Sequence, residues 1–383
     1  MASGPLGNPS PMFPVMLACA DTGAFAVGIG LLWRTQWGGR WRDVSIPVTV
    51  AGGLLVFAGL IGRQLTHSNF AYMRVACSAL FCVFAPLLML RGASMLRSRT
   101  ALGACLLILG LGMDAAYVRA CEMEPFDLQV RRYEAVSSAY RGRPLRIALI
   151  SDLQTDHVTA YEQAAFERVE AERPDLILLT GDYLQVLSQE AYERERPALL
   201  ALFDRIRHRP PLGMFAVHGD VDWSSHSLDG APVRLLEDES VVLPGAGVQI
   251  IGLANVLGRR TLPLNLESAA RAFPGLTIVA VHRPDVAADA LFNGVDGAAG
   301  RLLFVAGHTH GGQIVLPGFG PLMTLSSLPR RYAGGFHALP RRGADGPGGW
   351  LAVSRGVGCE REWAPRIRLF CPPELVFITV RGE

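Results

Sequence analysis

Two histidines one residue apart, His308 and His310, stand in the sequence Gly-His-Thr-His-Gly-Gly-Gln at residues 307–313. This turn follows an apolar run, residues 302–306, that is typical of a buried strand. Because glycine lets the backbone come close, both imidazoles could reach one small cavity. Neutral imidazole is a common ligand of transition metals. A lone His-x-His pair could equally be a polar turn whose rings only hydrogen-bond, so its meaning depends on the rest of the chain.

Four further apolar runs end in the same kind of residue. The runs cover residues 146–150, 175–179, 213–217 and 276–281, and the residues that follow them are Asp152, Asp182, Asp220 and His282. The segments 160–173 and 190–208 have the character of helices, so the chain alternates strands with helices and is of the α/β class. Such proteins place their sites at the carboxyl ends of successive strands. Five strand ends that carry Asp and His therefore predict a metal site.

The order of these motifs resembles that of the calcineurin-like metallophosphoesterases. An Asp near a strand end is followed by Gly-Asp at 181–182, by Gly-Asp-Val-Asp at 219–222, by His282, and by the Gly-His-Thr-His motif. The resemblance covers about residues 140–383. It is closest to a membrane-anchored bacterial branch, in which Gly-His-Thr-His-Gly-Gly-Gln precedes Leu-Pro-Gly, as at 316–318 here. It implies a four-layer α/β/β/α sandwich.

The resemblance also implies two divalent metal ions, with Mn, Zn or Fe expected. Asp182 would bridge them. The first ion would take Asp152, Asp182 and His310, with Gln154 at the position where the family has a histidine; the second would take Asp182, Asp220, His282 and His308. Gln154 offers only a neutral carbonyl, so the first site is expected to be the weaker one.

Two other positions depart from the family pattern. Asp220 replaces an asparagine ligand, and a carboxylate oxygen is a fair substitute for an amide oxygen. Val221 replaces the histidine that assists the leaving group, and it can neither donate a proton nor bind charge. Neighbouring residues that could substitute are Asp156, His157, His218 and Asp222. No catalytic residue beyond the metal ligands is assigned.

The implied activity is hydrolysis of a phosphomonoester, phosphodiester or pyrophosphate by a metal-bound hydroxide. No phosphate-cradling Gly-x-x-x-x-Gly-Lys loop is present. The missing histidines at 154 and 221 leave open a second reading: a catalytically weakened domain that binds metal or a phosphorylated ligand and acts as a membrane sensor or scaffold. A transporter or receptor is a third reading, which rests only on Asp21 and Asp114 in the apolar part of the chain.

Composition indicates a membrane part ahead of this domain. The chain is 50% hydrophobic over 383 residues, and the excess lies in the first 120. Apolar stretches at about 11–33, 46–62, 71–90 and 101–118 approach the roughly 20 residues of a membrane span. Arginines between the first and second stretches, and between the third and fourth, predict cytoplasmic loops, which places the C-terminal domain outside the cytoplasm of a bacterial inner membrane. A lipid-linked phosphoester is the favoured substrate, with membrane lipid as a partner.

We therefore predict a four-helix transmembrane region at residues 1–120, a linker and edge strand at 121–143, and the metallophosphoesterase domain at 144–383. The net charge is only +2, from 36 basic and 34 acidic residues, and this near balance excludes the basic stripe that nucleic-acid binding requires. Of the seven cysteines, Cys359 and Cys371 are candidates for a disulfide outside the cell.

Overall fold

The computed structural model describes residues 69–383 except 187, 223–225, 298 and 362. Contacts divide the chain into two compact units. The first comprises Met1–Met123 with Glu360–Arg366, and the second comprises Glu124–Cys359 with Ile367–Glu383. The second unit is called the α/β domain below.

Residues 69–123 of the first unit are mainly helical. Helix α3 (Asn69–Ser78), a π-helical stretch (Ala79–Phe84) and α4 (Ala85–Met95) follow one another, and α5 (Thr100–Tyr117) comes next. The helices pack closely, because a Cβ on Gly92 would lie 2.5 Å from the backbone nitrogen of Leu107.

Two helical segments of the described chain, Phe70–Met95 and Thr100–Phe126, are long and apolar enough to cross a membrane. The stretches predicted at about 71–90 and 101–118 fall on these helices. Those at about 11–33 and 46–62 lie outside the described residues, so the four-helix region stays a prediction.

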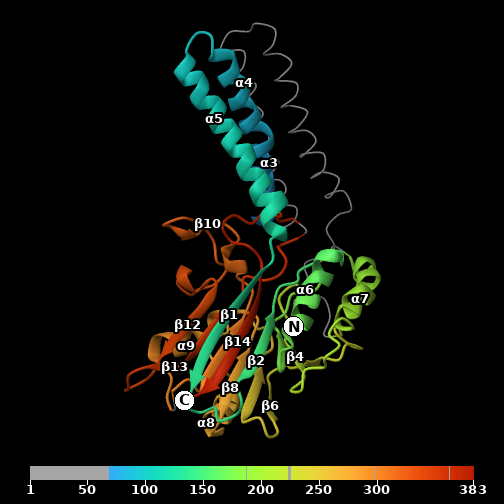
Figure 1. Cartoon of the computed structure of the whole chain (residues 1–383), viewed down its shortest axis with the longest axis vertical. Coiled ribbons are helices and arrows are strands. Elements are labelled where there is room, and N and C mark those ends of the chain that lie inside the picture. The colour runs from blue at the N-terminus through green and yellow to red at the C-terminus, as the bar shows by residue number, and fades with distance from the viewer. Residues whose placement is uncertain (1–68, 187, 223–225, 298, 362) are drawn as a thin grey trace. The chain divides into compact units, whose positions relative to one another are not determined.

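Two six-stranded sheets form the α/β domain (Figure 1). The first has the order β1 (Gln129–Ser137), β14 (Glu374–Gly382), β2 (Leu145–Ile150), β3 (Leu176–Leu179), β4 (Met214–Ala216), β5 (Arg234–Leu235). The second has the order β12 (Gly335–Pro340), β13 (Pro347–Val353), β9 (Leu302–Ala306), β8 (Leu276–Ala280), β7 (Val248–Gly252), β6 (Glu239–Leu243). The pair β10 (Val315–Leu316) and β11 (Gly320–Pro321) forms a separate small hairpin.

Parallel pairing dominates the centre of both sheets. Strands β2, β3 and β4 are parallel to one another, and so are β7, β8 and β9. The sequence Leu-Ile-Leu-Leu of β3 is buried on both faces, as expected for a parallel strand that is covered on two sides. Because parallel strands end at one edge, the loops after β2, β3, β4, β8 and β9 carry their polar residues to the same side of the domain.

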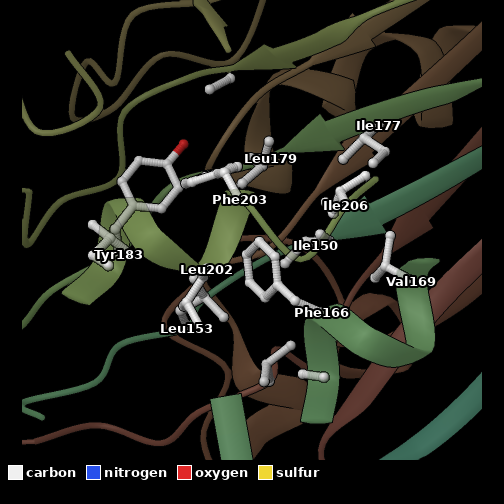
Figure 2. Close-up of a cluster of buried hydrophobic side chains, with 14 of the residues drawn as sticks. Ile150, Leu153, Phe166, Val169, Ile177, Leu179, Tyr183, Leu202, Phe203 and Ile206 are labelled. Atoms are coloured by element: carbon white, nitrogen blue, oxygen red, sulfur yellow. The ribbon is translucent and has the colours of Figure 1, made fainter. Parts of the chain in front are cut away.

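Three hydrophobic clusters separate four layers. One lies between the first sheet and the helices α6 (Ala160–Glu172) and α7 (Gln189–Phe203), where Phe166 meets Phe203 edge-on with ring centroids 5.3 Å apart (Figure 2). A second joins the two sheets, with Ile147 and Leu178 from one and Ile278 from the other. The third lies between the second sheet and the helices α8 (Leu264–Ala272) and α9 (Ala288–Asn293). The layers therefore follow the order α/β/β/α.

Local sequence explains where the two longer helices of the domain begin. The Thr159 side chain accepts a hydrogen bond from Tyr161 N and the Glu162 side chain reaches back to Thr159 N, which together cap α6. Ser188 caps α7 by accepting a hydrogen bond from Ala191 N. The segments predicted as helical from 160 and from 190 are helices, although α7 ends at Phe203.

Candidate metal centre

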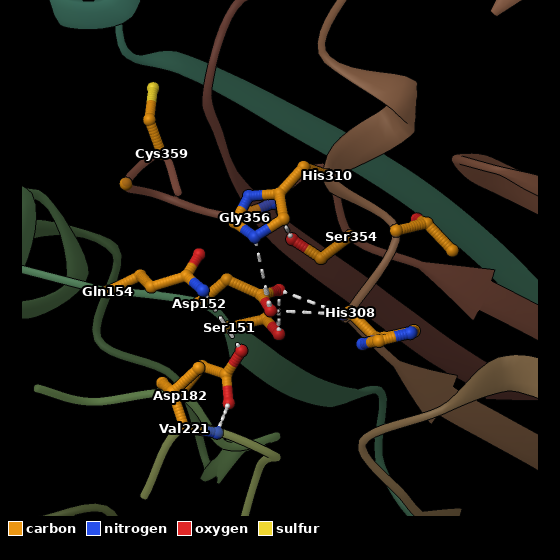
Figure 3. A network of polar contacts seen from close by, with 12 residues as sticks. Ser151, Asp152, Gln154, Asp182, Val221, His308, His310, Ser354, Gly356 and Cys359 are labelled. Carbon is orange, nitrogen blue, oxygen red and sulfur yellow. Dashed lines mark hydrogen bonds and ion pairs between the residues drawn. The ribbon is translucent and has the colours of Figure 1, made fainter. Parts of the chain in front are cut away.

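Residues from both sheets meet at the carboxyl-terminal edge. Asp152, Asp182 and Asp220 follow β2, β3 and β4 of the first sheet, and the three histidines follow β8 and β9 of the second. Figure 3 shows Asp152, Gln154 and Asp182 in a group with His308 and His310. The structure thus brings together the seven residues singled out as ligands, of which only Asp220 is appreciably exposed: Asp152, Gln154, Asp182, Asp220, His282, His308, His310.

Interatomic distances divide the ligand atoms into two overlapping groups. In the first, Asp220 Oδ1 lies 3.4 Å from His282 Nε2, and Asp220 Oδ2 lies 3.3 Å from His308 Nδ1. In the second, Asp152 and Asp182 lie with His282, whose Nε2 is 3.5 Å from Asp182 Oδ2. His310 is set further back, with Nε2 3.9 Å from Asp152 Oδ1.

The backbone at these positions is strained. Positive φ angles occur at Asp152 (48°), Gln154 (39°), Asp182 (59°), His308 (69°) and His310 (48°). Each such angle in a non-glycine residue costs on the order of 1–3 kcal/mol. Five of the seven predicted ligands share this conformation, which turns their side chains together. Strain concentrated in this way is characteristic of functional sites.

Two glycines allow the strand-end loops to approach one another. A Cβ on Gly307 would lie 1.8 Å from Ser151 Oγ and 2.3 Å from Asp152 Oδ2. A Cβ on Gly219 would lie 1.9 Å from Asp182 Oδ1. These positions therefore exclude any side chain, and the glycines of the Gly-His and Gly-Asp motifs are required for close packing around the carboxylates.

Hydrogen bonds fix which ring nitrogens of His282 and His308 face the site. Nδ1 of His282 lies 2.7 Å from the carbonyl of Thr180 and Nε2 of His308 lies 3.1 Å from the carbonyl of Leu325. A carbonyl only accepts, so these nitrogens carry the protons in the neutral rings. Nε2 of His282 and Nδ1 of His308 consequently point lone pairs toward the carboxylates, which is the arrangement of a metal-binding histidine and its outer-shell partner.

His310 has a different partner. Its Nδ1 lies 3.4 Å from Nη2 of Arg368, a fully buried side chain. Guanidinium has donors only, so Nδ1 accepts and the proton of the neutral ring lies on Nε2, the nitrogen that faces Asp152. Burial and the Arg368 charge both hold the pKa of His310 well below its ordinary value. His310 is thus a neutral ring whose acceptor atom points away from the site.

Several buried polar atoms at the centre form no hydrogen bond with the described residues: Nε2 of His282, Nε2 of His310 and Oε1 of Gln154. Buried polar groups are normally satisfied, so three such atoms beside two aspartates need an explanation. A cation beside the two aspartates would satisfy the lone pair of His282 directly. By this test the residues of the site fit a divalent metal ion.

Electrostatics leads to the same conclusion. Burial raises the pKa of Asp152 to about 6 and that of Asp182 well above its usual value. Burial opposes protonation of His282, but Asp182, Asp220 and Asp152 raise its pKa to about 10. Burial, with the charge of His282, lowers the pKa of His308 to about 4. The crowded carboxylates therefore favour positive charge among them, and a bound metal ion would supply it.

Gln154 and Val221, the two departures from the family pattern, both contact Asp182. Gln154 Nε2 donates to Asp182 Oδ2 at 3.3 Å, and the backbone N–H of Val221 donates to Asp182 Oδ1 at 3.1 Å (Figure 3). The side chain of Val221 adds no polar atom. Gln154 would have to turn its amide to offer Oε1 to an ion at this carboxylate.

Two of the four neighbours considered as substitutes for the missing histidine have other roles. Asp222 accepts hydrogen bonds from the backbone nitrogens of Asp182, Tyr183 and Gly219 at 3.0, 2.9 and 2.7 Å. It therefore joins the loops after β3 and β4. His157 is exposed and its Nδ1 lies 2.8 Å from Glu195 Oε2.

The third of these neighbours, His218, lies close to the loop. It is 12% exposed, with Nδ1 3.9 Å from Asp222 Oδ2 and Nε2 3.7 Å from Glu237 Oε1. The fourth, Asp156, is exposed. His218 is the best placed of the four.

Sequence reasoning missed three residues that bear on the centre. Arg283 Nη2 lies 2.5 Å from Asp220 Oδ2, and the Ser151 hydroxyl donates to Asp152 Oδ2 at 2.5 Å. Arg368 approaches His310. Arg283 and Ser151 are sequence neighbours of expected ligands, and this adjacency could have identified them. Arg368 is distant in sequence from every expected ligand, so no motif pointed to it.

Both buried cysteines near this end of the chain, Cys359 and Cys371, are free thiols, so the disulfide considered from the sequence is absent from the structure. Sγ of Cys359 accepts a hydrogen bond from Arg368 Nε at 3.3 Å. Sγ of Cys371 instead lies 3.4 Å from the carbonyl oxygen of His310. Each thiol therefore has its own polar partner.

An α/β/β/α sandwich that gathers Asp and His at its strand ends is the arrangement of a metal-binding α/β protein. No family model matches the chain. It is 27% identical over 275 residues to an uncharacterized metallophosphoesterase of Aquifex aeolicus, covering 68% of this chain and 95% of that one. The metallophosphoesterase YkuE of Bacillus subtilis is 26% identical over 224 residues, 55% of this chain and 69% of its own. A metallophosphoesterase of Campylobacter jejuni is 35% identical over 81 residues, 21% and 18% of the two chains.

With this fold, this site and these relatives, the chain is similar to the metallophosphoesterases, in line with its sequence resemblance to the calcineurin-like family. The likeness to metallophosphoesterases implies divalent metal ions, and the Asp and His groups described above could bind them.

Proposed function

We propose that the protein is a membrane-anchored, metal-dependent phosphoesterase whose centre is built by Asp152, Gln154, Asp182, Asp220, His282, His308 and His310. The observation that carries the proposal is the set of buried, unsatisfied ligand atoms beside two strained aspartates. In this proposal Asp220, His282 and His308 hold one ion, Asp152 and Gln154 face the other, and Asp182 lies between them.

Divalent ions bound there would polarise a phosphoryl oxygen and lower the pKa of a water molecule. The protein groups fit a reaction in which water attacks phosphorus directly. The Ser151 hydroxyl is engaged with Asp152, and the Cys359 thiol is buried against Arg368. Neither is free to act as a nucleophile.

The residues also suggest which leaving groups the site tolerates. Val221 provides no proton, and His310 keeps its acceptor atom toward Arg368. Arg283 places a cation at Asp220, next to where an anionic phosphate would bind. A site without a proton donor is suited to a phosphomonoester, phosphodiester or pyrophosphate with a good leaving group.

Membrane anchoring is the second part of the proposal. The helices Phe70–Met95 and Thr100–Phe126 support it by length and composition. We propose a multi-pass protein of a bacterial inner membrane, with the α/β domain outside the cytoplasm and a lipid-linked phosphoester as substrate. A reporter enzyme that works only outside the cytoplasm, fused after Glu383, should be active. Activity only from a cytoplasmic reporter would reverse the orientation.

A second candidate function is a metal- or phosphate-binding sensor that does not turn over. The observations that favour it are Val221 and the partner of His310. Full-length protein in detergent, analysed for metal content and for hydrolysis of bis-p-nitrophenyl phosphate, separates the two. Metal with hydrolysis supports the enzyme. A metal-loaded protein that is inert on mono-, di- and pyrophosphates supports the sensor.

A further inference from the structure

Exposed apolar side chains cluster on one segment of the α/β domain. Residues 314–325, which contain β10 and β11 and are called the apolar hairpin below, expose five large hydrophobic residues: Leu316, Phe319, Leu322, Met323 and Leu325. The tip residue, Phe319, is 59% exposed. Phe370, 58% exposed, lies next to this segment in the structure, because its neighbour Leu369 forms a β-bridge with Ile314. Exposed apolar side chains gathered on one segment in this way suggest an interaction site.

The apolar hairpin is fixed to the metal centre. The carbonyl of Leu325 accepts the hydrogen bond from Nε2 of His308, at 3.1 Å. A Cβ on Gly312 would lie 2.4 Å from Pro321 Cβ, so the base of the hairpin packs on the turn that follows His310. The hairpin therefore contacts the loop that carries the ligand histidines, and whatever covers the hairpin lies beside the site.

Hydrogen bonds within the α/β domain also connect this hairpin to Glu124, the first residue of the domain. Leu369 N donates to Gln313 O at 2.8 Å, and Val315 N donates to Leu369 O at 2.9 Å. Two residues further, the backbone N–H of Cys371 donates to the carboxylate of Glu124. Glu124 is in the last turn of the apolar segment Thr100–Phe126. Hydrogen bonds within the α/β domain thus link the hairpin to the point where that segment ends.

Charge at the hairpin also fits a bilayer surface. The guanidinium of Arg330 lies over the ring of Phe319, 4.8 Å from its centroid. The next residue, Arg331, lies 4.6 Å from the ring of Tyr332. Aromatic rings and arginine side chains together are characteristic of the interface between lipid headgroups and acyl chains, where the ring is buried and the cation meets phosphate.

From these observations we propose that the apolar hairpin sits in the interfacial layer of the lipid bilayer that Thr100–Phe126 crosses. The metal centre then opens at the membrane surface, where a phosphoester on a lipid can reach it. The proposal rests on that segment being a membrane span and not on catalysis, so it holds for an enzyme and for a sensor.

The test uses a photo-crosslinking amino acid, p-benzoylphenylalanine, in the full-length protein in nanodiscs of phosphatidylethanolamine and phosphatidylglycerol. It replaces Phe319, or Leu322 as a second hairpin position. Ile108, 68% exposed on α5, is the positive control for a segment in lipid. Phe292, 63% exposed on α9 outside the hairpin, matches Phe319 in type and exposure and is the negative control.

After illumination, intact-mass analysis should find the mass of a phospholipid added at Phe319, Leu322 and Ile108, and unmodified protein at Phe292. Adduct at Ile108 without adduct at either hairpin position would overturn the proposal. So would crosslinking of the hairpin to a second copy of the chain, or equal adduct at Phe292. Absence of adduct at Ile108 would overturn it as well, because the segment would not lie in the membrane. Metal content and hydrolysis, measured separately, decide the proposed function.

Discussion

The guanidinium of Arg283 lies 2.5 Å from the carboxylate of Asp220, a residue at the position where the sequence resemblance implies asparagine. Asp220 is the most exposed of the seven site residues, and Arg283 is mostly buried. The extra negative charge that aspartate brings is therefore matched by a cation from the strand end of the other sheet. Together with His282 and His308, Arg283 holds the pKa of Asp220 below its usual range although burial opposes this.

This pair should behave as a unit. Asp220→Asn leaves the Arg283 cation without its partner, and Arg283→Gln leaves the Asp220 carboxylate without its cation, so each change should destabilise the metal-free protein. The double variant should lose less free energy of unfolding than the two single variants added together. The difference, which is the coupling energy in a double-mutant cycle from denaturant unfolding, should be about 0.5–3 kcal/mol.

The exposed pair Arg271 and Glu267 on α8, 2.7 Å apart, is the matched control, with expected coupling of about 0.3–0.5 kcal/mol. Additive losses at Asp220 and Arg283 would show that their contact has no energetic role.

Asp182 should be indispensable. Its carboxylate is the point where Gln154, Val221 N and His282 meet, so Asp182→Asn removes the negative charge that all three groups contact. We expect a loss of hydrolysis on the order of 10²–10³-fold or more, the scale of removing a preorganised electrostatic group. Elemental analysis should show reduced metal content in the same sample.

Asp204→Asn makes the same chemical change at an exposed residue that follows α7 and should alter neither property. Full activity in Asp182→Asn would show that Asp182 is not part of the metal centre.

Metal occupancy should be unequal. The side of the centre near Asp152 has Gln154, with only a carbonyl to offer, and His310, whose acceptor nitrogen faces Arg368. The other side has Asp220, His282 and His308 with lone pairs directed inward. After mild dialysis against a chelator, elemental analysis should find closer to one ion than two per chain.

Gln154→His should raise occupancy of the weaker side, because imidazole is the better ligand for zinc or manganese. Gln189→His, an identical change at an exposed residue of α7, is the control. Two ions that survive prolonged chelation in the unaltered protein would contradict the asymmetry.

Much of the centre could be predicted because it follows from strand ends. Apolar runs that stop at Asp or His identify the loops, and parallel pairing of β2, β3 and β4 brings the loops to one edge. The family resemblance supplied the four-layer order. Neither the apolar runs nor the resemblance predicts that β14, the last strand, lies between β1 and β2. Pairing between strands so far apart in the sequence depends on tertiary packing.

The remaining features depend on contacts that have no local sequence signal. Arg368 reaches His310 across 58 positions, and Asp222 accepts three backbone N–H groups instead of donating a proton. The division of ligands was also not predictable: His282 lies close to both Asp182 and Asp220, whereas His310 is set back. Each of these depends on side-chain orientations that only the folded backbone determines.

Replacing Val221 with histidine distinguishes an enzyme from a sensor. Its backbone N–H contacts Asp182, so a histidine at this position would carry its ring beside the centre without disturbing that hydrogen bond. Val221→His should leave metal content unchanged. It should raise turnover on substrates with poor leaving groups by up to about 10²–10⁴-fold, the usual effect of a positioned general acid. Steady-state hydrolysis of phosphodiesters with leaving groups of increasing pKa measures the gain.

Val242→His, on the edge strand β6 and 52% exposed, is the matched control and should have no effect. A gain restricted to poor leaving groups means that the unaltered protein is an enzyme for activated phosphoesters. No gain, with activity already present, means that another group donates the proton; His218, 12% exposed beside Asp222, is then the first to replace. Metal-loaded but inert wild-type protein that becomes active in Val221→His would establish the sensor.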